Sequence, residues 1–300
     1  MTVISHLTSL IESIEKDKSI YYPRNFERRA DKIDELDFHI LDHIKTSIWD
    51  KGSQEDLSLL KLREERLKLS LEEIDDKLFH KLRERLLLGE YRQEEFRKLL
   101  AKYLDLNAGH FSVAAPVYDN LDTFINRLLC FDHVPQQQAV LEPEMIYYQK
   151  TPARVVLEIA KRCIFSPEDV FVDIGSGLGQ TSMLINLLSG IKSVGIEFDL
   201  AFCDYAKVRA SKLNMPKVTF IHADARRANY ANGTVFYLFT PFRGSVLRDV
   251  LASLQKQSNS RKIRLITYGP CTEGVAREGW LYSTIPDVTD VYCPAFFESF

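Results

Sequence analysis

The sequence predicts an α/β protein: a doubly wound, mostly parallel sheet in the C-terminal half, preceded by an all-α helical region. Three observations support this. From about residue 146 onward, strand-like and helix-like segments alternate. A β-prone run that begins at Val170 leads through a glycine-rich turn into a helical segment. Further upstream, apolar residues recur every three or four positions, as they do on one face of a helix.

The composition is that of an ordinary globular protein. The 300 residues allow one large or two ordinary domains, with 45% hydrophobic and 27% charged residues. The formal net charge of −3 provides no general attraction to nucleic acid or to anionic lipid. No apolar run is long enough to cross a bilayer, and the N-terminus lacks signal-peptide features. We therefore expect a cytoplasmic protein without a membrane partner, and the charge disfavours nucleic acid.

The cysteines indicate reduced thiols and no metal site. They are odd in number, scattered and never spaced as C-x-x-C. No basic residue lies near Cys271 in the sequence, so this thiol is expected to be buried and not nucleophilic. The five are Cys130, Cys163, Cys203, Cys271 and Cys293.

We divide the chain into a helical domain (1–107), a connector or cap (108–148) and a sheet domain (149–300). In the helical domain, apolar residues four apart, such as Leu78 and Leu82, form one buried face. Closely mixed charges between them are typical of a solvated surface and not of a nucleic-acid contact. No clean heptad persists, but a homodimer through this helical half remains an alternative.

The remaining elements are predicted in order. A helix near residue 121 begins with Asp119 or Asn120 as its cap, and another follows Thr151, which would be its N-cap. The tail from Trp280 to Phe300 adds the last, antiparallel strands. The predicted strands are 169–174, 192–197, 217–222, 233–239 and 262–268, and the helices between them are 180–189, 200–213 and 243–256.

The glycine-rich turn indicates a nucleotide ligand. Asp173 ends the first strand, and three glycines then alternate with other residues before a helix whose free N–H groups face the turn. A dinucleotide fingerprint would need glycine at the position of Gln180. That mismatch, and the lack of a recognisable Ser/Tyr/Lys set, disfavour an NAD-linked oxidoreductase.

Two more carboxylates follow the next strands. Glu197 ends its strand and could bridge two ribose hydroxyls, since an ionised carboxylate accepts several hydrogen bonds. Asp224 comes directly after the third strand and could accept from an exocyclic adenine amine. The fourth strand leads into Thr240-Pro-Phe242 at the carboxyl edge of the sheet, where a substrate is expected.

These motifs, in this order, resemble those of class I S-adenosylmethionine-dependent methyltransferases. Over residues 143–210 the chain is similar to the seven-strand, non-SET histone-lysine methyltransferases. The matching residues are Phe171 to Gln180, Gly195-Ile-Glu197, the pair Tyr205-Ala206, and Thr151 upstream. The resemblance implies a seven-strand Rossmann-like methyltransferase sheet that binds S-adenosyl-L-methionine. It also implies that the loop 143–151 closes over the methionine end of that cofactor, although Thr151 could be only a helix cap.

The resemblance does not extend to the acceptor. The family carries an Asn-Asn-Phe-type signature where this chain has Phe239-Thr-Pro-Phe242, which also departs from the Asn/Asp-Pro-Pro-Tyr/Phe motif. The predicted catalytic residues are Thr240, Pro241, Phe242 and Tyr148. The predicted cofactor-binding residues are Thr151, Asp173, Gly175, Ser176, Gly177, Gly179, Gln180, Glu197, Phe198, Asp224, Ala225 and Thr240.

Two functions remain open. The first is a transferase of the EC 2.1.1 type that methylates an amine, such as a protein lysine, or another nucleophile of a protein or small molecule. An aromatic slot would favour the neutral amine; Tyr147 and Phe242 are candidates, whereas Tyr237 and Phe239 are assigned to the core. The second is a methyltransferase-fold binding or regulatory subunit without conventional catalysis. His222 is expected to be a core histidine, not a metal ligand.

Overall fold

The computed structural model describes residues 3–46, 54–107, 115–131, 133–285 and 290–300. The chain separates into two compact units. The helical unit comprises residues 1–85 and 99–106, and the sheet unit comprises residues 86–98 and 107–300. No helix in the described part of the chain is long and apolar enough to cross a membrane.

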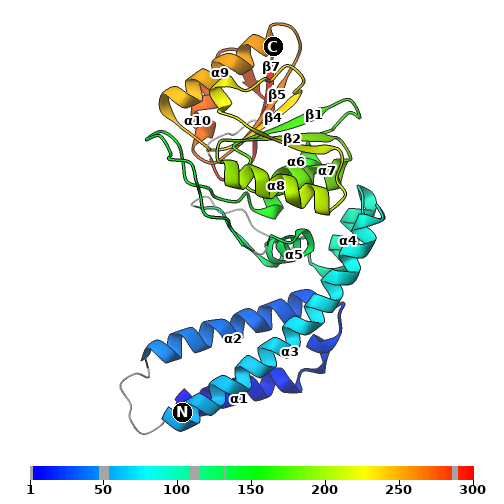
Figure 1. Cartoon of the computed structure of the whole chain (residues 1–300), viewed down its shortest axis with the longest axis vertical. Helices are drawn as coiled ribbons and strands as arrows, with labels where there is room; N and C mark the ends of the chain where they lie inside the picture. Colours follow the sequence, from blue (N-terminus) through cyan, green and yellow to red (C-terminus); the bar gives the residue numbers. More distant parts are fainter. Residues whose placement is uncertain (1–2, 47–53, 108–114, 132, 286–289) are drawn as a thin grey trace. The chain divides into compact units, whose positions relative to one another are not determined.

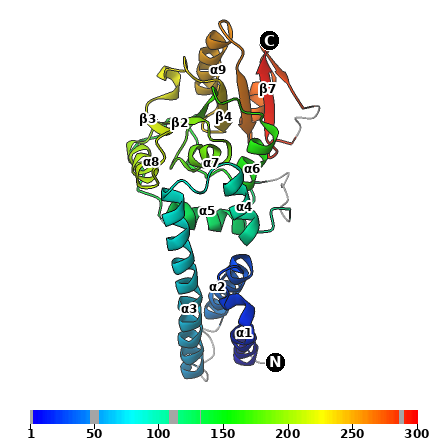
Figure 2. The same ribbon diagram turned by 90° about the vertical axis from the view of Figure 1, so that its right-hand side faces the viewer.

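The helical unit is built from amphipathic helices that bury one face against each other (Figures 1 and 2). A buried apolar cluster joins Ile11, Ile14, Leu36, Leu67 and Leu71. The helices are α1 (Val3–Lys16), η1 (Lys18–Tyr21), α2 (Phe26–Thr46) and α3 (Gln54–Leu87); α4 (Glu94–Tyr103) begins in the sheet unit and ends in the helical unit. Gly89, with φ of 79°, follows the end of α3.

A buried ion pair fastens the helical unit. The Arg29 guanidinium is 0% exposed and donates through Nε to the Asp75 carboxylate at 2.8 Å. The same side chain donates to the carbonyls of Ile20 at 2.8 Å and Tyr22 at 3.1 Å. Because Arg29 lies on α2 and Asp75 on α3, this cation connects both helices to the η1 turn.

The predicted fold class is confirmed. The sheet has seven strands in the order β3-β2-β1-β4-β5-β7-β6, of which the first five are parallel. β7 pairs antiparallel with β5, and β6 pairs antiparallel with β7, so β7 alone of the seven strands runs in the opposite direction. The strands are β1 (Val170–Ile174), β2 (Lys192–Glu197), β3 (Val218–His222), β4 (Val235–Phe239), β5 (Arg264–Tyr268), β6 (Leu281–Ser283) and β7 (Ala295–Ser299).

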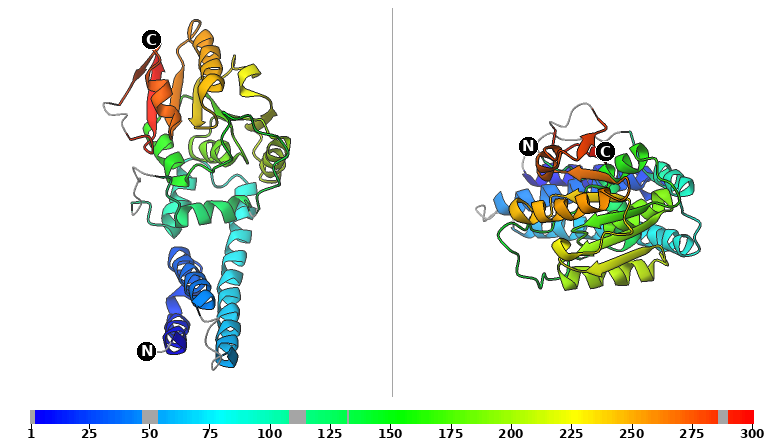
Figure 3. Two further views of the ribbon diagram at one scale, coloured as in Figure 1. Left: turned by 90° about the vertical axis from the view of Figure 1, so that its left-hand side faces the viewer. Right: turned by 90° about the horizontal axis from the view of Figure 1, so that it is seen from above.

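Different helices cover the two faces of the sheet (Figures 1 and 3). On one face, Leu238 of β4 packs with Val250 of α9 and Val275 of α10. Side chains alternate along a strand, so Phe171 and Tyr237 point to the opposite face, where their rings stack 6.0 Å apart. The helices of the sheet unit are α5 (Asn120–Leu129), α6 (Ala153–Arg162), α7 (Gln180–Ser189), α8 (Leu200–Lys212), α9 (Gly244–Ser258) and α10 (Cys271–Ala276).

The helix starts confirm one predicted cap and correct another. Asp119 caps α5 by accepting the Leu121 N–H at 2.8 Å. Thr151, however, does not cap α6: its hydroxyl lies 3.1 Å from the Tyr237 hydroxyl. The first N–H of α6, that of Ala153, is instead bound by the Asp122 carboxylate of α5 at 3.0 Å. A partner distant in sequence therefore replaces the local cap.

Candidate functional site

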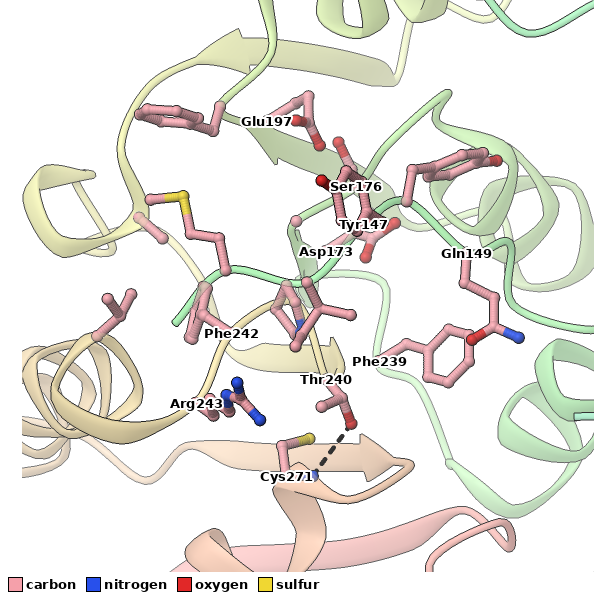
Figure 4. A pocket seen from close by; sticks show the side chains of 18 of the residues that line it. Tyr147, Gln149, Asp173, Ser176, Glu197, Phe239, Thr240, Phe242, Arg243 and Cys271 are labelled. Carbon is pink, nitrogen blue, oxygen red and sulfur yellow. Dashed lines mark hydrogen bonds between the residues drawn. The ribbon is translucent and has the colours of Figure 1, made fainter. Parts of the chain in front are cut away.

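A cavity of about 500 Å³ opens at the carboxyl ends of the central strands (Figure 4). Its walls come from the ends of β1, β2 and β4 and from the segment 137–151, which we call the strap. The strap crosses the cavity close to the labelled side chains of Asp173 and Ser176. This is the edge at which open parallel sheets bind their ligands.

Two glycines of the turn lie directly against predicted catalytic residues. Gly175 and Gly177 have φ of 79° and 53°, a region that favours glycine. A Cβ on Gly175 would lie 2.4 Å from the Pro241 side chain, and one on Gly177 would lie 2.2 Å from the Tyr148 ring. The turn therefore brings Pro241 and Tyr148 next to the bare backbone of β1–α7.

The Glu197 carboxylate is 9% exposed and faces the cavity from the end of β2. It accepts the Gly177 N–H at 2.7 Å and the Asp199 N–H at 2.8 Å. Burial raises the pKa of Glu197, although these backbone N–H groups oppose the shift. Two of the approximately four lone-pair sites of a carboxylate are in use, so Glu197 can still accept from a ligand.

Asp173, at the end of β1, is a buried acid with no cation beside it among the residues that the structure describes. Its only described hydrogen bond comes from the Ser182 hydroxyl at 3.3 Å. Burial raises the pKa of Asp173 to about 7, and the nearby Glu197 charge adds to this. A cationic group in the cavity would favour the ionised form of Asp173.

Two polar side chains of the cavity lack protein partners. Both the Oε1 and Nε2 atoms of Gln180, which is 4% exposed, make no hydrogen bond in the described structure, and neither does Ser176 Oγ. Both residues line the cavity. Buried polar groups are normally bonded, so these atoms are suited to a polar ligand.

Asp224, predicted to accept from adenine, is engaged by an arginine. Arg226 donates to its Oδ2 through Nη2 at 2.6 Å and to its Oδ1 through Nε at 3.0 Å. The guanidinium also donates to Glu142 of the strap at 2.9 and 2.6 Å. The hydrogen bond from Arg226 lowers the pKa of Asp224. Sequence reasoning missed both partners: Arg226 lies two residues from Asp224, but Glu142 lies 82 residues away.

The loop after β4 holds its side chains in structural contacts. Thr240 has φ of 38°, and its hydroxyl accepts the Cys271 N–H at 3.0 Å and donates to the Tyr268 carbonyl at 3.2 Å (Figure 4). Phe242 lines the cavity but is 5% exposed and belongs to the core beneath α9. Burial raises the pKa of the Cys271 thiol, which therefore stays protonated, in line with the buried role expected for it.

The strap is hydrogen-bonded to this same loop. The Ile146 N–H donates to the Pro241 carbonyl at 3.0 Å, and Met145 forms an antiparallel bridge with Phe242. The Glu144 carboxylate accepts the Val246 N–H at 3.0 Å at the start of α9. The strap and the loop after β4 thus form one connected wall, a role for Glu144 that no sequence motif indicated.

The structure brings the predicted catalytic and cofactor-binding residues together around the cavity. All of them line the cavity except Gly177 and Gly179, which lie in the turn behind it. Of the aromatic candidates, Tyr147 and Phe239 line the cavity, whereas Tyr237 is fully buried in the core. The sequence makes Phe239 a candidate for the aromatic slot but favours the core for it, and the structure places it at the cavity.

His222 is not the core residue that was expected. It is exposed, and its Nε2 lies 3.0 Å from the Phe198 carbonyl. It is the last residue of β3, the edge strand of the sheet. Among the described residues, no group of three His, Cys, Asp or Glu side chains could hold a metal ion.

A family model described as "Histone methylation protein DOT1" matches residues 144–227. This segment is similar to that family. It includes the strap from Glu144 onward, the glycine turn, Glu197 and Asp224. The predicted resemblance to histone-methylating proteins is therefore confirmed for the nucleotide motifs. No curated protein matches the chain significantly.

Several solved structures are similar to the chain. An RNA methyltransferase from Salinibacter ruber in complex with S-adenosyl-L-homocysteine is 21% identical, with a TM-score of 0.41, over 50% of this chain and 92% of that one. A SAM-dependent methyltransferase from Aquifex aeolicus is 13% identical, with a TM-score of 0.39, over 48% and 89%. One from Geobacter sulfurreducens, also with S-adenosyl-L-homocysteine, is 22% identical, with a TM-score of 0.33, over 51% and 60%.

Proposed function

We propose that the chain is an S-adenosyl-L-methionine-dependent methyltransferase. The observation that carries the proposal is the set of unfilled polar groups in the cavity. Among the described residues, Gln180 and Ser176 have buried atoms without partners, and Asp173 is a buried acid without a cation. The similarity of residues 144–227 to a histone-methylating family supports the same reading.

The residues present fit each part of this cofactor. Asp173 would hold the ammonium group of the methionine end, and Gln180 and Ser176 would bond its polar atoms. Glu197 retains acceptor sites for two ribose hydroxyls. The cofactor, when bound, supplies an activated methyl group, so the protein has mainly to bind and orient the acceptor.

An amine acceptor suits the side of the cavity formed by Phe239, Thr240 and Cys271 (Figure 4). Burial beside the Phe239 ring disfavours the charged ammonium form and so favours the neutral, nucleophilic amine. Within the described part of the cavity, Thr240 and Cys271 are held by hydrogen bonds and are not available as bases. We propose either a protein lysine or a small-molecule amine as the methyl acceptor.

Calorimetric titration with S-adenosyl-L-homocysteine tests cofactor binding, and transfer of labelled methyl groups to amine acceptors tests catalysis. We expect binding in the first experiment and loss of transfer in Asp173→Ala. Absence of binding heat at millimolar ligand would reject the proposal.

One observation favours a regulatory subunit as the second candidate. The Pro241 carbonyl already accepts the Ile146 N–H and the Thr240 hydroxyl already accepts the Cys271 N–H, so each oxygen keeps one lone pair at most to orient an acceptor. A protein of this kind would bind S-adenosyl-L-homocysteine in the calorimeter but transfer no methyl group to any acceptor.

A further inference from the structure

Every acceptor site of the Asp224 carboxylate is filled in this structure. Oδ1 accepts the backbone N–H of Arg226 at 2.8 Å and its Nε at 3.0 Å. Oδ2 accepts the same Nε at 3.0 Å and Nη2 at 2.6 Å. A carboxylate offers about four lone-pair sites, so another donor can bind Asp224 only if the guanidinium moves away.

The Arg226 guanidinium is also paired with a second acid, Glu142. Glu142 of the strap binds the far edge of the Arg226 fork through both of its oxygens. The Arg226 side chain is 27% exposed, that of Asp224 19% and that of Glu142 45%. Pairs exposed to this degree are weak enough to exchange. Arg226 can therefore leave Asp224 while it stays paired with Glu142.

The position of Arg226 decides which hydrogen-bonding groups a ligand meets at the Asp224 end of the cavity. Asp224 and its neighbours Ala223 and Ala225 line the cavity after β3. With Arg226 in place, the charge of Asp224 is neutralised and its acceptor sites are filled, so this edge neither accepts from an amino group nor repels an oxo group. With Arg226 withdrawn, it offers a carboxylate, which accepts from an amino group and repels an oxo group.

We propose that Arg226 is the specificity-determining residue of the nucleoside end, and that it must yield Asp224 before an aminopurine is recognised. This inference rests on the proposed cofactor site. Arg226 therefore competes with the amino group of adenine, but it keeps the Asp224 carboxylate from repelling the oxo group of the deaminated analogue. A residue that merely stabilised the loop would affect both ligands in the same direction.

The test compares S-adenosyl-L-homocysteine with S-inosyl-L-homocysteine on the full chain, by calorimetry and stopped-flow mixing. In Arg226→Gln we expect the adenosyl ligand to bind about three- to tenfold more tightly and faster, the scale of a partly exposed bidentate pair. The inosyl ligand should bind more weakly. The control is Arg227→Gln, which removes the same charge from the exposed neighbour and should change neither ligand.

In a second variant, the affinity for the adenosyl ligand should change in the opposite direction. Glu142→Gln leaves Asp224 as the only acid that holds Arg226, so the adenosyl ligand should bind about threefold more weakly, within the range for an exposed pair. Parallel changes for both ligands in Arg226→Gln, or no change, would overturn the inference. If the wild type binds neither ligand, the proposed function itself fails, and that result is distinct from a wild type that binds but whose selectivity does not depend on Arg226.

Discussion

The Thr240 hydroxyl accepts the Cys271 N–H at 3.0 Å and so connects the end of β4 to the start of α10. This bond helps to hold Thr240 at a φ of 38°, which is costly for a branched residue. The Thr240 side chain therefore shapes the loop that would meet the acceptor.

Thr240→Ala should destabilise the sheet unit. The substitution leaves the Cys271 N–H without a partner inside the protein, at a cost of about 1–3 kcal/mol. Thr240→Ser keeps the hydroxyl and should cost much less. Urea unfolding of the two variants checks this, and equal stability losses would contradict the role of the bond.

Asp173 should make the ligand-free protein less stable as pH rises. Its pKa in the folded protein is about 7, above the ordinary value of 3.8. Between these values the folded state binds the extra proton, so the unfolding free energy falls as pH increases toward 7, by at most about 4 kcal/mol. Asp173→Asn should remove this slope. Urea unfolding at pH 5 and pH 8 measures it, and parallel slopes for both proteins would contradict the assignment.

Glu197→Gln should weaken binding of S-adenosyl-L-homocysteine. Loss of charged hydrogen bonds to the ribose predicts a decrease of about 1.5–3 kcal/mol. The amide keeps the size of the side chain, but its nitrogen cannot accept the N–H bond that the second carboxylate oxygen accepts. The control is Glu168→Gln, an exposed position outside the cavity. Calorimetry gives both affinities, and an unchanged affinity in Glu197→Gln would exclude the ribose role.

Asp75→Ala should destabilise the helical unit strongly. It leaves the fully buried Arg29 guanidinium without its anion, a change that costs about 3–5 kcal/mol in buried pairs. The double variant Arg29→Met/Asp75→Leu removes both charges and should recover much of that loss. Thermal unfolding followed by circular dichroism compares the stabilities of the wild type, the double variant and Asp75→Ala. An Asp75→Ala variant as stable as the wild type would refute the prediction.

The sequence predicts the fold well where local signals agree. β2 and α7 begin and end where expected, because a buried apolar run and a glycine turn mark their limits. Prediction from the sequence fails where a residue distant in the chain supplies the hydrogen-bond partner. Asp122 took the capping role expected of Thr151, and His222 lies exposed at the end of the edge strand β3.

The site shows the same division. The glycine turn, Asp173, Glu197 and Asp224 follow one another in a recognisable order, so their meeting at one sheet edge is predictable. The contacts made by the strap are not, since Glu142 meets Arg226 and Glu144 meets α9 only after the chain has folded. No local pattern encodes such pairs.

The most direct test of the account is calorimetric titration of the full chain with S-adenosyl-L-homocysteine, beside Asp173→Asn as a matched variant. For the wild type we predict one-site binding whose affinity increases as pH rises through about 7, where Asp173 ionises. In Asp173→Asn the affinity should not depend on pH in this range. No binding at millimolar ligand, or the same pH profile in both proteins, would contradict it.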